Sequence, residues 1–138
     1  MVAEVVAQLD MKHVIVVHGM DGLDEISILG RTSIAEVTGD TINRYEIAPE
    51  DFGFARATLE EVQGGSPEFN GQVIRDIFDG KDTGPRRDFL LLNNGFALYA
   101  AGVADSPERG IAMARENLES GAAARKLEEV AADSHALA

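Results

Sequence analysis

The stretch His13-Val14-Ile15-Val16-Val17 decides the fold of this 138-residue chain. Its continuous run of apolar, mostly β-branched residues predicts a strand that is buried on both faces, as strands of parallel sheets are. Residues 1–10 carry valine and leucine at helical spacing, which predicts a helix ahead of the strand. A helix followed by a fully buried strand predicts half of an α/β unit in a parallel sheet.

The residues after this strand predict an antiparallel hairpin. Residues 32–37 and 41–47 alternate polar and apolar side chains on either side of the turn Thr38-Gly39-Asp40. Such alternation is typical of paired strands with one solvated face. We place all strands within residues 11–48 and expect the short run Ile26–Leu29 to be extended.

The remainder, residues 58–132, is predicted to be helical. Ser66-Pro67-Glu68 and Ser106-Pro107-Glu108 give the same start signal, a serine cap followed by proline and an acid. A helix from Pro85 to about Val103 is apolar on nearly every side and should be central, and a last helix should run from Pro107 towards Val130. The predicted fold class is α/β, a partial sheet of one buried parallel strand plus an antiparallel hairpin, packed by C-terminal helices.

Composition restricts the possible partners and the compartment. The chain has 24 acidic and 12 basic residues, so its net charge of −12 argues against binding to nucleic acid. No stretch approaches the roughly 20 apolar residues of a membrane span, and the first residues do not predict a signal peptide. The chain contains no cysteine, which suits the cytoplasm, where we expect the protein to reside.

Two adjacent carboxylates, Asp24 and Glu25, are the candidate metal ligands. They follow the end of a predicted strand, where ligands of α/β proteins bind, and Mg²⁺ is often held by one or two carboxylates plus substrate phosphates. Spacing alone favours a simpler interpretation, in which the two acids form a solvated rim beside a turn. Asn93 and Asn94, inside the apolar helix, are predicted to be polar links rather than ligands, because buried amides need hydrogen-bond partners.

Several motifs along the chain resemble those of the anthranilate phosphoribosyltransferase family. The most specific is Val16-Val17-His18-Gly19 followed by Asp21-Gly22-Leu23-Asp24-Glu25. Residues 49–53 resemble the conserved turn of that family, and residues 84–88, 91–93 and 97–99 resemble its core helix. The motifs occur in the order that the family has.

The resemblance implies a transferase of tryptophan biosynthesis. Members of the family move the phosphoribosyl group of phosphoribosyl pyrophosphate to the amine of anthranilate, with Mg²⁺, and usually form homodimers. The acidic pair that matches Asp24 and Glu25 holds the Mg²⁺ at the pyrophosphate site. With the resemblance included, metal binding becomes the favoured role of this pair, and we expect a homo-oligomer.

The resemblance covers only the C-terminal part of such an enzyme's α/β domain. The family's glycine-rich phosphate-binding loop and its N-terminal helical domain have no counterpart in residues 1–138, so we expect the isolated chain to be inactive. Two alternatives remain open: a fragment similar to a pyrimidine nucleoside phosphorylase, and a non-catalytic module that associates with itself through an open sheet edge.

Overall fold

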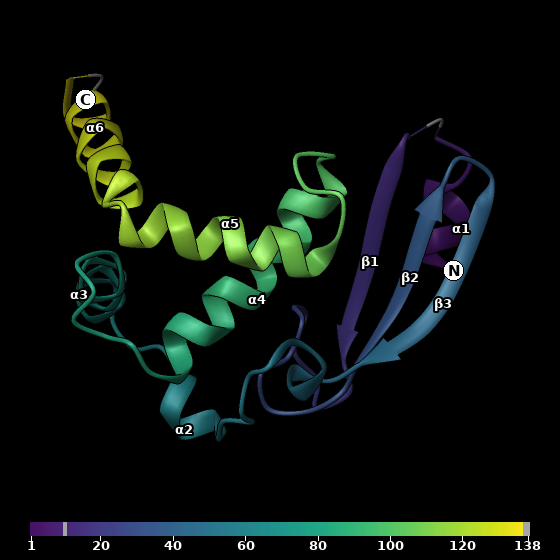
Figure 1. The fold of residues 1–138 in the computed structure, drawn as a ribbon, viewed down its shortest axis with the longest axis horizontal. Coiled ribbons are helices and arrows are strands. Elements are labelled where there is room, and N and C mark those ends of the chain that lie inside the picture. The colour runs from purple at the N-terminus through teal and green to yellow at the C-terminus, as the bar shows by residue number, and fades with distance from the viewer. Residues whose placement is uncertain (10, 137–138) are drawn as a thin grey trace.

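The computed structural model describes residues 1–9 and 11–136, and shows a small sheet beside a group of helices (Figure 1). The elements are, in order, α1 (Val2–Val6), β1 (His13–Gly19), β2 (Thr32–Thr38), β3 (Thr41–Ile47), the 3₁₀ helix η1 (Pro49–Phe52), α2 (Leu59–Val62), α3 (Pro67–Phe78), α4 (Pro85–Ala100), α5 (Pro107–Glu119) and α6 (Ala122–Ala136). The mixed α/β class is therefore confirmed. Residue 10, where we expected the first helix to end, lies outside the described residues. Within the described ranges, no helix is both long and apolar enough to cross a membrane.

The three strands form one antiparallel sheet in the order β1-β2-β3. The predicted hairpin is confirmed as β2 and β3, but the prediction of a parallel, fully buried first strand is wrong. β1 pairs antiparallel with β2, with Ile15 opposite Glu36, and most of its residues are half-buried. The chain returns from β1 to β2 through the loop 20–31, without the crossover helix that a parallel pair needs.

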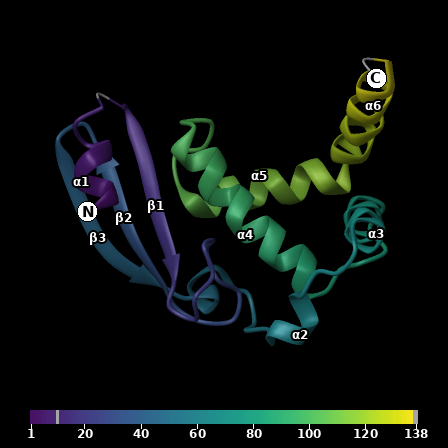
Figure 2. The same cartoon turned by 180° about the vertical axis from the view of Figure 1, so that it is seen from behind.

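Both faces of the sheet are covered, which explains the continuous apolar run in β1. Ile15 and Val17 pack towards the main core on the side of α4, whereas Val14 and Val16 pack on the opposite face with Ala3 of α1. Figure 2 shows α1 lying beside the sheet, with α4 on the other side of β1. This second face of the hairpin, predicted to be solvated, is thus partly buried. The apolar stripe of α1 faces away from the sheet, since Val2, Val5 and Leu9 are 56–61% exposed.

The main core lies where the face of the sheet, the loop 20–31 and helices α4 and α5 meet. Its buried residues are Ile26, Ile28, Ile34, Ile47, Phe54, Ala57, Leu91, Leu92, Phe96, Ile111 and Ala114. Helix α4 is central, as predicted, but only one of its faces is buried.

The helix start signals are confirmed, and one predicted helix is divided in two. Ser66 Oγ accepts a hydrogen bond from the Phe69 amide, and Ser106 Oγ accepts one from the Arg109 amide. The helix expected from Pro107 towards Val130 ends at Glu119, and α6 begins at Ala122. Gly121 has a φ of +70°, and a left-handed glycine at this place ends a helix.

Helices α4 and α5 cross with their backbones in contact at two glycines. A Cβ atom on Gly110 would lie 2.2 Å from the carbonyl oxygen of Gly95, and one on Gly95 would lie 2.2 Å from Cγ1 of Ile111. No side chain fits at either position without moving one helix, so the crossing depends on glycine.

Glu36 links the three strands to α4 through a cluster of hydrogen bonds. Its Oε1 atom accepts from His13 Nε2 and from the Tyr99 hydroxyl, each at 2.8 Å, and its Oε2 atom accepts from the Tyr45 hydroxyl at 2.8 Å. Burial alone would raise the pKa of Glu36, but the bonds from Tyr99, Tyr45 and His13 outweigh it and hold the pKa below its ordinary value. The carboxylate is therefore more stable in the folded chain than in the unfolded one.

Replacing Gly110 with alanine is expected to lower the free energy of unfolding by about 1–3 kcal/mol or more, because the new methyl group overpacks the crossing of α4 and α5. Urea unfolding monitored by circular dichroism measures the effect. Gly71→Ala in α3 is the matched control, since a Cβ there meets no atom within 4 Å and should stabilise the helix by about 0.5–1 kcal/mol. Equal stability of the two variants would contradict the close crossing.

The Glu36→Gln variant should be less stable than the wild type near neutral pH by about 1.5–3 kcal/mol, since it loses charge-assisted hydrogen bonds. Because the folded pKa of Glu36 is lowered, this difference is fully present above the unfolded pKa of about 4.3 and shrinks as the pH falls below it. Urea unfolding of both proteins across this range measures the difference. The exposed Glu119→Gln is the control, and a difference independent of pH would show that the charge of Glu36 is not involved.

Candidate metal centre

The candidate site lies on the loop 20–31, which begins with a tight turn at the end of β1. The Gly19 amide donates to the carbonyl of Leu23, and the Gly22 amide donates to the carbonyl of Gly19, each at 2.9 Å. A Cβ atom on Gly19 would lie 2.7 Å from Oδ1 of Asp21 and 3.1 Å from Cβ of Leu23. A side chain at residue 19 would therefore displace Asp21 and crowd Leu23, so glycine suits this turn.

Ser27, which is buried, organises the middle of the loop. Its Oγ atom accepts from the amides of Leu29 and Gly30 at 2.9 and 3.2 Å, and donates to the carboxylate of Asp21. Its own amide donates to Oγ1 of Thr32 at 2.8 Å. The segment 26–29, predicted to be extended, is therefore an irregular turn folded around one hydroxyl.

This role of Ser27 was missed at the sequence level. The sequence signal that could have found it is a serine between two isoleucines. A serine that is buried together with these isoleucines must form hydrogen bonds through its hydroxyl.

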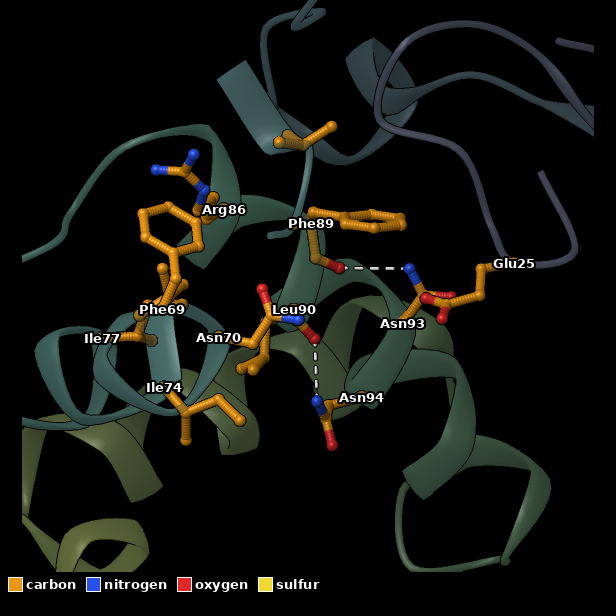
Figure 3. A pocket seen from close by; sticks show the side chains of 13 residues that line it. Glu25, Phe69, Asn70, Ile74, Ile77, Arg86, Phe89, Leu90, Asn93 and Asn94 are labelled. Carbon is orange, nitrogen blue, oxygen red and sulfur yellow. Dashed lines mark hydrogen bonds between the residues drawn. The ribbon is translucent and has the colours of Figure 1, made fainter. Parts of the chain in front are cut away.

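Asn93 of α4 holds the loop from the helical side. Its Oδ1 atom accepts from the Ile26 amide at 3.0 Å, and its Nδ2 atom donates to the Ile26 carbonyl at 2.9 Å and to the Phe89 carbonyl at 3.1 Å. The predicted polar link is thus confirmed for Asn93. Asn94 differs, since it is exposed and donates to the carbonyl of Leu90 in its own helix (Figure 3).

The structure leaves Asp24 and Glu25 at the surface between these fixed points. Both residues are exposed, and neither makes a hydrogen bond or ion pair with another residue in the described part of the chain. Asp21, the third acid of the loop, has its carboxylate bonded to Ser27 and to the Leu23 amide. Among the described residues, no three histidine, aspartate or glutamate side chains gather as a metal-binding group.

The chemistry of these two side chains fits Mg²⁺. Two exposed carboxylates provide the hard oxygen ligands that this ion prefers. Mg²⁺ commonly takes its remaining ligands from water and from substrate phosphates, so a site with two protein ligands leaves the positions that a phosphorylated substrate would fill.

A cavity of about 490 Å³ lies next to the acidic pair, between α3 and α4 (Figure 3). Glu25 and Asn93 line it together with apolar residues that include Phe69, Ile77 and Phe89. Arg86 also lines the cavity, with its guanidinium 5.5 Å from the centre of the Phe69 ring.

Two further polar residues, Arg87 and His18, lie outside this loop. The guanidinium of Arg87 forms an ion pair with the carboxylate of Asp88 at 2.8 Å. His18 is exposed at the end of β1.

Comparison with known proteins identifies the family of the chain. Residues 1–124 match the family described as "Glycosyl transferase family, a/b domain". Anthranilate phosphoribosyltransferase of Haloarcula marismortui is 52% identical over 128 residues, which are 93% of this chain and 38% of that protein. The chain therefore spans somewhat over a third of the length of this curated relative.

Solved structures show the same fold. The crystal structure of anthranilate phosphoribosyltransferase from Thermus thermophilus superposes with a TM-score of 0.76 at 39% identity, covering 85% of this chain and 34% of that one. The enzyme from Saccharomyces cerevisiae in complex with PRPP and Mg has a TM-score of 0.74 at 28% identity, covering 83% of this chain and 33% of that one. The chain therefore belongs to the glycosyl transferase family whose a/b domain matches residues 1–124.

Proposed function

We propose that this chain is the C-terminal part of an anthranilate phosphoribosyltransferase of tryptophan biosynthesis. The intact enzyme transfers the phosphoribosyl group of phosphoribosyl pyrophosphate to the amine of anthranilate. The observation that carries the proposal is the exposed acidic pair on a fixed loop, in a chain 52% identical to such an enzyme over 93% of its length.

Asp24 and Glu25 are the proposed Mg²⁺ ligands. When bound there, Mg²⁺ would offset the negative charge that grows on the departing pyrophosphate. The complex of the Saccharomyces cerevisiae enzyme with PRPP and Mg supports this assignment at the level of the family. In this chain, the loop 20–31 leaves both carboxylates exposed, whereas the carboxylate of Asp21 accepts hydrogen bonds from Ser27 and from the Leu23 amide.

In this proposal, the other catalytic residues of the intact enzyme belong to the segment that corresponds to the unmatched part of its relatives. The match covers 38% of the Haloarcula marismortui protein. Binding of the ribose phosphates and of anthranilate would come from the unmatched part, so the isolated chain should not turn over substrate. The proposed pathway places the intact enzyme in the cytoplasm.

Self-association remains part of the proposal. Within the described residues, one edge of β1 has no strand partner, and an open edge can pair with another chain. Together with the exposed valines of α1, this edge supports the expected homo-oligomer.

The function can be tested with a chimera in which this chain replaces the matching C-terminal part of the Thermus thermophilus enzyme, whose structure defines the junction. The chimera should consume anthranilate in the presence of phosphoribosyl pyrophosphate and Mg²⁺, which the loss of anthranilate fluorescence measures. The Asp24→Asn/Glu25→Gln variant should lower kcat/KM by about a hundredfold or more, since a metal at a leaving group contributes several kcal/mol to the transition state.

The matched control is Asp40→Asn/Glu119→Gln, which removes the same charge at two other exposed positions. Its kcat/KM should equal that of the unmodified chimera. A folded but inactive chimera would contradict the proposed enzyme, and full activity of the Asp24/Glu25 variant would contradict the proposed metal site. Turnover by the isolated chain would show that the unmatched part is not needed.

A further inference from the structure

The side chain of Asn93 holds both backbone groups of one residue, Ile26, in the loop that bears the acidic pair. Its carboxamide bonds both to the amide and to the carbonyl of Ile26, 67 residues away in the sequence. We propose that Asn93 is a positioning residue for the cation site of Asp24 and Glu25. This inference rests on the proposed function, because it concerns the same site.

The carboxamide is itself held in one orientation. Its Nδ2 atom also donates to the Phe89 carbonyl one turn earlier in α4, at 3.1 Å. The fully buried side chains of Leu91 and Leu92 hold α4 in the core. The hydrogen bonds of Asn93 therefore fix Ile26 at a defined position relative to this helix. The loop is thereby fixed relative to the protein core.

The acidic pair lies between two fixed residues. On one side, the Leu23 amide donates to Asp21 at 3.2 Å and the Leu23 carbonyl accepts from Gly19 at 2.9 Å. On the other side, Ile26 is held by Asn93. Adjacent carboxylates in a regular strand point to opposite faces, so joint binding of one cation requires a backbone that is not a regular strand, and residues 24 and 25 meet this condition. Ordering the loop during folding removes an entropic cost from cation binding.

Asn93 differs in this respect from its neighbour. Asn94 is exposed, bonds only within α4 among the described residues, and makes no hydrogen bond to the loop there. A substitution at residue 94 therefore changes the helix surface and leaves the loop as it is, which makes this residue the matched control.

The experiment titrates the 138-residue chain with Mn²⁺ alone and records amide NMR spectra. In the wild type, substoichiometric Mn²⁺ should broaden the amide signals of residues 24 and 25 first, and Asp24→Asn/Glu25→Gln should abolish this preference. Asn93→Leu keeps the side-chain size and removes all three hydrogen bonds, so it should weaken Mn²⁺ binding by about tenfold, as loss of groups that orient metal ligands does. Asn94→Leu should bind as the wild type does.

Two further measurements separate positioning from general stability. Hydrogen exchange of the Ile26 amide should be fast in Asn93→Leu and slow in Asn94→Leu, since among the described residues this amide donates to Asn93 alone. Asn93→Ala serves if the leucine variant does not fold, and should show the same weakening of Mn²⁺ binding. A loss of thermal stability without a change in Mn²⁺ affinity would overturn the inference and assign Asn93 a structural role alone.

The outcomes distinguish this inference from the proposed function. Equal Mn²⁺ affinity of Asn93→Leu and Asn94→Leu, with binding abolished by Asp24→Asn/Glu25→Gln, would overturn the positioning role and leave the cation site in place. If Mn²⁺ broadens the signals of the wild type without preference for residues 24 and 25, both the positioning role of Asn93 and the proposed cation site are overturned.

Discussion

The burial of one face of helix α4 is the interaction on which the rest of the structure depends. Leu91 and Leu92 are fully buried and Phe96 is 3% exposed, in one core with isoleucines of the loop, the sheet and α5. Polar and backbone contacts extend from the same helix: Tyr99 to the sheet, Asn93 to the loop, and Gly95 to α5. Since these contacts come from one continuous helix, they fix the sheet, the loop and α5 relative to one another.

The loop 20–31 uses chemically similar acids in two different ways. The carboxylate of Asp21 bonds to Ser27 and to a backbone amide, and so stabilises the turn. Asp24 and Glu25 make no such bond within the described chain and remain exposed. A turn that is already stabilised by its own groups leaves the pair available for an external cation, and in our proposal that cation meets the pyrophosphate of the substrate.

Local sequence signals predicted the elements whose stability is local. The alternation in residues 32–37 and 41–47 identified the hairpin, because a strand with two unlike faces shows a period of two. The two serine-proline starts identified α3 and α5, since the cap bonds form within one turn. The break at Gly121 was missed, because the apolar pattern of α5 continues into α6 and only the left-handed glycine separates them.

Predictions that depended on distant partners were less successful. The apolar run of β1 suggested a parallel sheet, but its two faces are covered by α1 and by the core beside α4, and the pairing itself is antiparallel. An apolar run indicates that a strand is buried, but parallel and antiparallel sheets can bury a strand equally well. Which partner covers each face depends on contacts between residues far apart in the sequence.

The sequence by itself determined the hairpin, the helix starts and the family resemblance, and it made Asp24 and Glu25 the candidate metal ligands, because each of these depends on a short run of residues. Only the tertiary structure decided that Asp21 is bonded within the loop while Asp24 and Glu25 make no hydrogen bond among the described residues, and that Asn93 holds the backbone beside them. The physical reason is that a hydrogen bond between residues 26 and 93 depends on how helix and loop pack, and no local pattern records that packing.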